Sequence, residues 1–391
     1  MSISELSLRY GTNPHQTPAR VFIEPGQLPI QVLGGAPGYI NLLDALNGWQ
    51  LVRELKRATG LPAATSFKHV SPAGAAVAVP LDETLRRAYF IGEQELSPLA
   101  AAYARARGAD RVASFGDFVA LSDTVDVPTA QVLRREVSDG IIAPGYDPEA
   151  LAVLAKKHGG KYIILQVDAA YEPPAIERRE VFGITFEQRR NDASIGPDIL
   201  RDRVTADTSL TPDAERDMMV ALITLKYTQS NSVGLARDGQ MIGIGAGQQS
   251  RILCTRLACS KADHWHLRQH PSVLDLPFAE KPPRPERDNA IDLYLGDQPS
   301  PDEEAAWLKS FRRLPQRLSA EEKSAWREGL HGVTLGSDGF IPFRDNIDRA
   351  AQSGVAYVVQ PGHSLRDPDV IAACNEYGMV MAFTGLRLFH H

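Results

Sequence analysis

Lys68 and His69 form the pair of neighbouring side chains best suited to chemistry in this sequence. They lie at the end of a strand-like segment, residues 63–70, which the run SPAG at 71–74 is expected to halt. An ammonium can stabilise a developing oxyanion, and an imidazole titrates close enough to neutral pH to move a proton. Ligands of open α/β sheets usually bind at the carboxyl ends of strands, where this pair is expected.

One geometric condition applies to this pair. Neighbouring residues on a regular strand point to opposite faces, so both can serve one site only where the backbone breaks, and we place that break in the SPAG turn. The alternative is a surface lysine beside a packed histidine.

A second candidate is the glycine-rich segment GIGAGQQSR at residues 243–251. Its backbone N–H groups could approach a phosphate or carboxylate, and Arg251 would fall in the opening turn of a helix, where an anion is favoured. The spacing is not that of a dinucleotide fingerprint, and no Walker A motif occurs in the chain. The alternative is a tight turn beneath a closely packed helix.

The run KYTQSNS at residues 226–232 is polar, yet it lies between an apolar helix-like segment and an apolar strand-like segment. Such runs are usually solvated loops, but one enclosed in this way can hydrogen-bond a ligand. The sequence leaves both interpretations open.

Metal-binding patterns are incomplete. His266 and His270 have helical spacing without the glutamate of a zincin, Cys254 and Cys259 lack a second pair, and the zinc-deaminase signature is missing. We therefore expect no catalytic metal.

The last two residues, His390 and His391, allow two interpretations. They could be a tag remnant or a disordered tip, because termini are usually poorly ordered. The segment GLRLF at 385–389 is nevertheless largely apolar right up to them, as though the terminus packs inside.

The elements that position these residues alternate between strand-like and helix-like pieces, which favours an α/β fold. Residues 41–59 have apolar side chains at three- and four-residue spacing and are followed by Gly60, so they predict a helix. A turn-helix-strand unit after residue 145 has an echo after residue 362. The echo favours a duplicated fold, although common α/β patterns explain it about as well.

Residues 272–331 have a different texture. The Pro-rich run at 276–288 predicts no regular structure. Charged amphipathic helices follow, one at 303–314 and one that begins at a capping box of Ser319 and Glu322. We expect a helical excursion from the sheet.

Composition sets the class of protein. The 391 residues carry 42 Lys and Arg against 48 Asp and Glu, a formal charge of −6, which does not favour nucleic-acid binding. A hydrophobic share of 43% is typical of globular chains, and the length predicts two or three domains. The absence of a long apolar run, of a secretory signal and of a disulfide framework predicts a cytoplasmic protein without a membrane partner. Anionic ligands would then be held by a few placed Arg and Lys residues.

Seven segments together resemble one known family. They are RYGTNPHQ at 9–16, SFKHVSPAGAA at 66–76, SDGIIAPG at 138–145, YTQSN at 227–231, GIGAGQQSR at 243–251, FRDN at 343–346 and RLFHH at 387–391. In this order and over nearly the whole chain, they resemble the formyltransferases of aminoimidazole carboxamide ribonucleotide (AICAR), the transformylase part of the bifunctional purine-biosynthesis protein.

The resemblance implies a fold and a reaction. The fold would be two cytidine-deaminase-like three-layer αβα subdomains without the zinc, at residues 1–175 and 176–391, with the excursion at about 272–331 inserted in the second. The reaction would be formyl transfer from 10-formyltetrahydrofolate to the 5-amino group of AICAR, on the way to inosine monophosphate (IMP). A homodimer with sites at its interface is implied, and a structural monovalent cation is compatible with the resemblance.

The resemblance also implies roles for individual residues. His69 resembles the general base, Lys68 the group that stabilises the transition state, Asn231 an amide that orients the substrate, and His391 an active-site histidine. The residues that resemble AICAR contacts are Arg9, Tyr10, Gly116, Asp139, Arg251, Phe340 and Arg387. Those that resemble folate contacts are Ile252, Asp345, Asn346, Ser364 and Leu365.

Two departures from the family pattern stand out. The first motif begins at Arg9, so the cyclohydrolase domain that usually precedes it does not occur in this sequence. We therefore expect a formyltransferase without cyclohydrolase activity, with a separate IMP cyclohydrolase as a partner. In addition, His363 stands where a small residue is expected, which bears on the nearby folate contacts.

Two other functions remain as alternatives. An enzyme that uses formate and ATP to make the same product is disfavoured by the missing Walker A motif. A catalytically silent binding relative is disfavoured by the intact Lys68, His69, Asn231 and Arg387.

Overall fold

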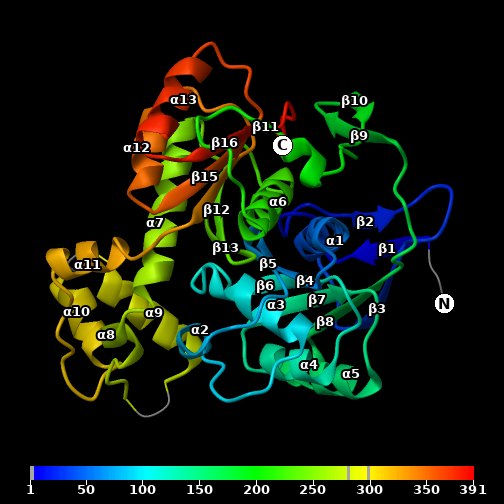
Figure 1. The fold of residues 1–391 in the computed structure, drawn as a ribbon. Coiled ribbons are helices and arrows are strands. Elements are labelled where there is room, and N and C mark those ends of the chain that lie inside the picture. Colours follow the sequence, from blue (N-terminus) through cyan, green and yellow to red (C-terminus); the bar gives the residue numbers. More distant parts are fainter. Residues whose placement is uncertain (1–3, 280–281, 297–299) are drawn as a thin grey trace.

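A computed structural model describes residues 4–279, 282–296 and 300–391 (Figure 1). One mixed sheet of 12 strands crosses the molecule in the order β11-β16-β15-β14-β12-β13-β5-β4-β6-β7-β8-β3. The predicted α/β class is confirmed. The strands are β3 (Ile30–Gly34), β4 (Ala63–Lys68), β5 (Ser71–Val77), β6 (Asp117–Leu121), β7 (Ser138–Ala143), β8 (Ile163–Val167), β11 (Asp202–Arg203), β12 (Val233–Arg237), β13 (Gln240–Gly245), β14 (Val333–Ser337), β15 (Val355–Gln360) and β16 (Val380–Phe383).

The two halves of the sheet repeat one pattern of strand directions. In the first half, β4 and β5 form a hairpin, and β4 pairs antiparallel with β6. Strands β6, β7 and β8 run parallel, and β3 pairs antiparallel with β8 at the edge. In the second half, β12 and β13 form the hairpin, and β12 pairs antiparallel with β14. Strands β14, β15 and β16 run parallel, and β11 pairs antiparallel with β16. The halves join where β13 pairs with β5. A duplicated fold would show this repeat, while the domain boundary at residue 175 stays a prediction.

Helices cover both faces of the sheet, which gives three layers. On one face, α1 (Tyr39–Thr59) and α6 (Pro212–Lys226) share a hydrophobic core with the strands. The opposite face has its own core and carries α2 (Glu83–Ala88), α3 (Pro98–Gly108), α4 (Val127–Arg134), α5 (Pro148–Leu154), α7 (Arg251–Leu267), α12 (Asp345–Ala351) and α13 (Asp367–Glu376). Two short 3-10 helices lie at Lys157–Gly160 and Pro197–Leu200.

Helix α1 shows how local sequence sets these elements. Its buried Leu42, Trp49, Val52 and Leu55 recur at the spacing that predicted a helix, and Gly60 ends it in the left-handed conformation (φ 72°). The helix begins at Tyr39, two residues earlier than predicted, because the Asn41 side chain accepts a hydrogen bond from the Gly38 N–H (2.9 Å) and so caps the first turn.

Residues 272–331, expected to form a helical excursion, contain helices that stand apart from the sheet. Four helices project around the C-terminal part of α7 (Figure 1) and have a hydrophobic core of their own. They are α8 (Pro271–Leu274), α9 (Arg284–Leu295), α10 (Pro301–Leu308) and α11 (Ala320–Arg327). The capping box of Ser319 and Glu322 is present at α11.

Two boundaries in the excursion differ from the prediction. The Pro-rich run was expected to stay irregular to residue 288, but α9 begins at Arg284, because Pro285 occupies the first turn, where a helix needs no backbone donor. The helix expected at 303–314 ends at Leu308. Positions 280–281 of the Pro-rich run lie outside the described residues.

Two ribbons stand outside the main sheet, β1 (Glu5–Leu8) with β2 (Ala19–Phe22), and β9 (Ile176–Val181) with β10 (Ile184–Arg189). Every residue of β9 and β10 is exposed, and Phe182 at their turn is 99% exposed. The β9–β10 ribbon lies beside the C-terminal end of the chain (Figure 1), where Arg179 donates to the carbonyl of His391 (2.8 Å).

Two observations bear on the kind of protein. Cys254, Cys259 and Cys374 are buried and free. In the part of the chain that the structure describes, no helix combines the length and the apolar character needed to cross a membrane.

Candidate active site

A cavity of about 260 Å³ brings together five of the residues singled out in the sequence. They are far apart in the sequence, and Tyr10 comes from the segment between β1 and β2, outside the main sheet: Tyr10, Lys68, His69, Gly116 and Asp139. The rest of the lining is Gly11, the start of α1 at Gly38, Tyr39, Ile40, Asn41 and Asp44, and Phe118. We call this the first cluster.

Lys68 and His69 can both line this cavity because Lys68 ends a strand and His69 is the first residue of the turn that follows it. β4 ends at Lys68, and His69 and Val70 both have positive φ, 54° and 56°, which makes the two-residue turn of a hairpin. The turn interrupts the strand alternation. The prediction that the SPAG run halts the strand is wrong, because Ser71 already begins β5.

The edge of the sheet at which this pair lies also differs from the prediction. Lys68 is at the carboxyl end of β4, but β4 is antiparallel to β6. The first cluster therefore lies at the amino ends of the parallel strands β6 and β7, where Gly116 precedes β6 and Asp139 is the second residue of β7.

The polar groups of the first cluster interact electrostatically. The Lys68 ammonium donates to the carbonyl of Phe115 (2.6 Å), directly before Gly116. Gly116 has a φ of 71°, a conformation that suits glycine, and faces the Asp139 carboxyl. Burial raises the pKa of Asp139, and the positive charges of His158, Lys68 and Lys157 oppose that rise.

Asp44 belongs to this cavity and was missed from the sequence. Its carboxylate accepts a hydrogen bond from the N–H of Val70 (2.7 Å), and burial raises its pKa, against the N–H of Val70 and the charge of His69. The signal was present, because Asp44 shares a helical stripe with the buried Gly48, Leu51 and Leu55. A carboxylate on an apolar stripe needs a partner.

A second cluster surrounds the start of α7. The Arg251 guanidinium forms a buried ion pair with Asp338, donates to the Asn231 side-chain oxygen (2.7 Å) and donates to the Ser232 carbonyl (3.0 Å). Ser230 also donates to Asp338 (2.6 Å). The polar run at 226–232 is therefore largely enclosed and hydrogen-bonded, not a solvated loop.

The C-terminal tail packs into the second cluster. The N–H of Leu388 donates to the Asp338 carbonyl (2.8 Å), and the His390 N–H and carbonyl pair with the Ser230 hydroxyl and N–H (each 3.0 Å). Burial lowers the pKa of His390. The interpretation of the terminus as a disordered tip is wrong. The apolar segment at 385–389 correctly predicted that the terminus packs against the rest of the chain. His391 itself is exposed, as are Arg387 and Phe340.

Most of the remaining predicted residues follow strands of the second half, whereas Arg9 follows β1. Ile252 follows Arg251 in α7, and Asp345 begins α12. Asn346 is buried and accepts from Thr255 of α7 (2.7 Å). Ser364 and Leu365 lie in the loop between β15 and α13, where Leu365 is 100% exposed. Arg9 is exposed beside Tyr10.

His363 adopts a conformation that explains why a small residue was expected there. Its φ is 71°, and the neighbouring Gly362 has a φ of 75° with the ring of Phe383 so close that a Cβ would lie 2.6 Å from it. The loop that carries Ser364 and Leu365 therefore leaves β15 through two left-handed residues.

The glycine-rich segment is a packing device. A Cβ on Gly243 or Gly245 would lie 2.1 Å from the backbone oxygen of Ala258 or Cys254 on α7. These two glycines let the helix lie directly on β13, which was the alternative left open by the sequence. Arg251 is the first residue of α7, as predicted.

Both clusters lie at one edge of the sheet. Strand pairing places the carboxyl ends of β13 to β16 and the amino ends of β5 to β7 at the same edge. The strands β12 and β4 are separated by β13 and β5, which corresponds to about 14 Å. One hydrogen bond links their surroundings, from the Gln229 N–H to the hydroxyl of Ser71 at the start of β5 (3.3 Å).

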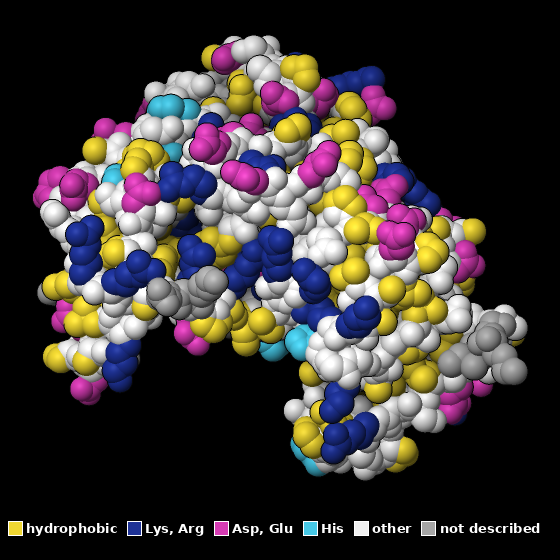
Figure 2. Space-filling view, turned by 90° about the horizontal axis from the view of Figure 1, so that it is seen from below, with side chains coloured by type: hydrophobic (Ala, Val, Ile, Leu, Met, Phe, Trp, Pro, Cys, Tyr) yellow, Lys and Arg dark blue, Asp and Glu magenta, His cyan; other side chains and the backbone are white. Residues whose placement is uncertain are grey.

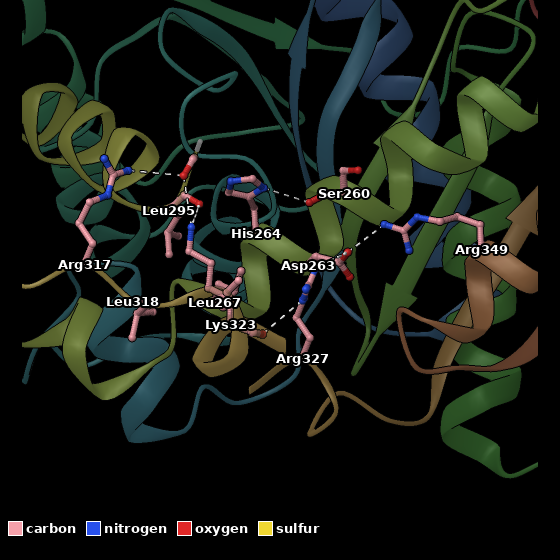
Figure 3. Close-up of a pocket in the computed structure, with 12 residues that line it drawn as sticks. Ser260, Asp263, His264, Leu267, Leu295, Arg317, Leu318, Lys323, Arg327 and Arg349 are labelled. Atoms are coloured by element: carbon pink, nitrogen blue, oxygen red, sulfur yellow. Dashed lines mark hydrogen bonds and ion pairs between the residues drawn. The ribbon is translucent and has the colours of Figure 1, made fainter. Parts of the chain in front are cut away.

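A larger cavity, of about 730 Å³, lies between α7, α9, α11 and α12 (Figure 3). Its basic side chains are committed to the chain itself: Arg349 to Asp263 (2.8 Å), and Arg317 and Lys323 to carbonyls at the end of α9 (each 2.7 Å). It holds none of the predicted residues, and we assign it no ligand. Across the described residues, no group of His, Cys, Asp and Glu has the arrangement of a metal site.

Comparison with known proteins identifies the family. Residues 2–261 match the family described as AICARFT/IMPCHase bienzyme. The chain is similar to proteins named "Bifunctional purine biosynthesis protein PurH": it is 31% identical to that of Xylella fastidiosa strain M12 over 98% of this chain and 58% of the relative. It is 30% identical to that of Roseobacter denitrificans, over 98% of this chain and 60% of the relative.

The fold and the two clusters thus define a three-layer α/β protein with polar groups gathered at one sheet edge. The chain belongs to the AICARFT/IMPCHase bienzyme family. It spans about three fifths of the length of the curated relatives that it matches.

Proposed function

We propose that this protein is a purine-biosynthesis enzyme that transfers the formyl group of 10-formyltetrahydrofolate to the 5-amino group of AICAR. The observation that carries the proposal is the presence of Lys68 and His69 in one cavity with Tyr10, Gly116 and Asp139. Family membership and the names of the relatives support it.

The two side chains suit the two demands of this reaction. The lone pair of the AICAR amine is delocalised into its ring, so the amine needs a base as it attacks, and His69 would take that proton. The formyl oxygen gains negative charge as its carbon becomes tetrahedral, and the Lys68 ammonium would stabilise that charge in place of its present contact with Phe115. The C–N bond between the formyl carbon and tetrahydrofolate then breaks, and the proton held by His69 passes to the folate nitrogen that leaves. The products are the formylated amine and tetrahydrofolate.

The second cluster would hold the anionic and folate parts of the ligands. Arg251 and Arg387 would bind the phosphate or the carboxamide oxygen, because a guanidinium donates in pairs. Asn231, already bonded to Arg251, would orient the substrate. The exposed Asp345 can accept from the pterin N–H groups, and the fully exposed Leu365 can cover its ring.

We also propose that the protein acts as a homodimer. The β9–β10 ribbon presents Ile176, Val181, Phe182, Ile184 and Phe186 to solvent, and each is about half exposed or more. Exposed apolar side chains on a ribbon outside the main sheet form a site for association with another chain. Since Arg179 of the ribbon bonds to His391, a second copy seated on the ribbon would lie beside the second cluster.

A steady-state assay of tetrahydrofolate release with AICAR tests the proposal. Replacing His69 with Ala should lower kcat by about 10²- to 10⁴-fold and leave the KM for folate within a few-fold. The exposed His331, changed to Ala, is the control and should retain activity. Wild-type protein without folate-dependent turnover would overturn the proposal, and unchanged turnover in the His69 variant would remove His69 as the base. The same assay, extended to IMP, measures whether the chain also closes the ring.

A further inference from the structure

Two hairpins in equivalent places of the two half-sheets have turns of the same shape. The β4–β5 turn consists of His69 (φ 54°) and Val70 (φ 56°), and the β12–β13 turn consists of Asp238 (φ 51°) and Gly239 (φ 74°). Positive φ at both central residues is the type I′ geometry, which suits the right-handed twist of the strands.

Each turn is held by a buried aspartate on the helix that covers that half. Asp44 is the sixth residue of α1 and accepts from the N–H of Val70 (2.7 Å). Asp217 is the sixth residue of α6 and accepts from the N–H of Gly239 (2.6 Å). In both halves the donor is the second residue of the turn, so the same anchor occurs twice in the chain.

The two turns differ in how well their residues fit this geometry. Asp-Gly is among the preferred sequences for a type I′ turn, because glycine pays no steric cost at positive φ and aspartate tolerates it. His-Val fits poorly, since a β-branched residue at positive φ is a genuine outlier. The turn whose residues disfavour its conformation is the one that contributes His69 to the first cluster.

We propose that Asp44 is a positioning residue that holds the His69–Val70 turn in its left-handed conformation, and so presents Lys68 and His69 to one cavity. Without the anchor, Val70 would relax to negative φ, the strand would continue past Lys68, and the two side chains would point to opposite faces. Asp44 lines the same cavity as His69, and the two side chains interact electrostatically. The effect on turnover rests on the proposed function, whereas the anchoring of the turn does not.

The neighbourhood of Asp44 agrees with this role. Its carboxyl is almost fully buried, at 5% exposure, and its raised pKa comes from burial, with the N–H groups of Val70 and His69 opposing that rise. A buried carboxyl that receives backbone N–H groups fixes the backbone that donates them.

Four variants test the proposal. Asp44→Asn keeps an acceptor for Val70, Asp44→Ala removes it, Val70→Gly removes the conformational conflict, and Asp44→Ala with Val70→Gly combines the two. Asp217→Ala is the matched control, because it deletes the same hydrogen bond from a turn whose residues fit without it. Hydrogen exchange of the Val70 amide and steady-state formyl transfer are measured for each.

We expect Asp44→Ala to speed Val70 amide exchange by about tenfold or more and to lower kcat by roughly tenfold or more, with a smaller change in KM. Asp44→Asn should retain most of the protection of the Val70 amide and most of the kcat. The double variant should recover most of the lost kcat, because glycine adopts the turn unaided, and Asp217→Ala should keep kcat within about threefold of wild type while losing some stability.

Several outcomes would overturn the proposal. They are unchanged Val70 exchange in Asp44→Ala, a double variant no more active than Asp44→Ala, or an equal loss of kcat in Asp217→Ala. If Asp44→Ala does not fold, the double variant decides, because the added Val70→Gly change should then restore folding, and a double variant that also fails to fold would overturn the proposal. Wild-type protein with no formyl transfer, together with faster exchange in Asp44→Ala, would refute the proposed function and leave the anchor standing.

Discussion

At the scale of single residues, the charges at the candidate site already have partners within the chain. Arg251 is bonded to Asp338 and Asn231, and Lys68 to a carbonyl. A phosphate or a developing oxyanion must compete with these contacts, so the geometry of each donor decides how well it binds. A guanidinium carries five N–H donors, so Arg251 can hold Asp338 and Asn231 and still donate to a ligand.

Replacing Arg251 with Lys should therefore raise the KM for AICAR by about tenfold or more, because an ammonium cannot donate in two directions of one plane. The change in kcat should be smaller. Steady-state kinetics at varied AICAR measures both, and Arg256→Lys, on the exposed face of the same helix, is the control. Equal KM values for the two variants would show that Arg251 serves Asp338 alone.

Sequence reasoning at this scale worked where chemistry is adjacent in the chain and failed where it is not. Lys68 and His69 were found because they are neighbours. Asp338, the ion-pair partner of Arg251, lies 87 residues away along the chain, and no local pattern connects them. Asp44 was overlooked because the search for helical periodicity counts apolar residues. A buried carboxylate on the same helix face is simply not counted.

At the scale of elements, the C-terminal tail and the β9–β10 ribbon carry the proposed assembly of the site. The tail is tied to Ser230 and Asp338 through its backbone, and the ribbon is tied to the tail through Arg179. Neither contact could be predicted from the sequence. The tail and the ribbon have no repeating pattern of buried apolar residues that would show where they pack.

Deletion of His390 and His391 should lower activity strongly, by about tenfold or more, because it removes the backbone pairing with Ser230 beside Asn231. Formyl transfer by the truncated protein is the measurement. A variant with both histidines changed to Ala keeps the backbone, so it separates packing from the proposed role of the His391 side chain. A fully active truncated enzyme would contradict both roles.

Replacing Phe182 with Asp should weaken the proposed dimer, because it places a charge at the apolar tip of the ribbon. Sedimentation velocity over a range of protein concentrations reports the change as a shift toward monomer. Leu314→Asp, at another exposed apolar position, is the control. A wild-type protein that sediments as a monomer would refute the dimer.

Local signals predicted element ends better than turns. Gly60, the capping box at Ser319 and the first position of α7 all followed from residue types at known positions. The His69–Val70 turn did not, because neither residue favours positive φ and its cause is Asp44, far back on α1. The Pro-rich run misled because proline ends a helix in its interior but suits its first turn.

At the scale of the whole molecule, buried ion pairs tie the helical excursion to the sheet. Glu136, just before β7, pairs with Arg107 and Arg111 of the first half and with Arg284 of α9. Arg111 also pairs with Asp288 of α9 (2.9 Å). Opposite charges buried in this way are costly to separate, so the excursion and the first half should unfold together.

The pH dependence of stability should reflect this network. Burial alone would raise the pKa of Glu136, but Arg111, Arg107 and Arg284 outweigh it and hold the pKa at about 2, against an ordinary value of 4.5. A lowered carboxyl pKa adds stability above about pH 4.5, which is lost as the pH falls toward 2, here by about 3 kcal/mol.

Glu136→Gln should therefore be less stable than wild type at pH 7 and lose less stability between pH 5 and about pH 3. Urea unfolding at a series of pH values measures this, with the exposed Glu149→Gln as the control. Parallel pH profiles for wild type and Glu136→Gln would contradict the assignment.

The overall charge of −6 gives no hint of how local charges are arranged. Seen from below, Lys and Arg side chains gather in the hollow between the excursion and the rest of the molecule (Figure 2). Cavities at the base of the excursion are lined by Arg87, Arg268, Arg287, Arg312 and Arg313. The expectation that a few placed Arg and Lys residues hold an anionic ligand stays a prediction, and none of the arginines that line these cavities was among the predicted residues.

The most direct test of the central claim is to follow a labelled formyl group. Wild-type protein is mixed with AICAR and 10-formyltetrahydrofolate that carries ¹³C in the formyl group, and the products are read by mass spectrometry. We predict that the label moves to the AICAR amine without ATP and that tetrahydrofolate forms in equal amount. Label that stays on the folate, or product formed only from formate and ATP, would contradict the proposed formyl transfer.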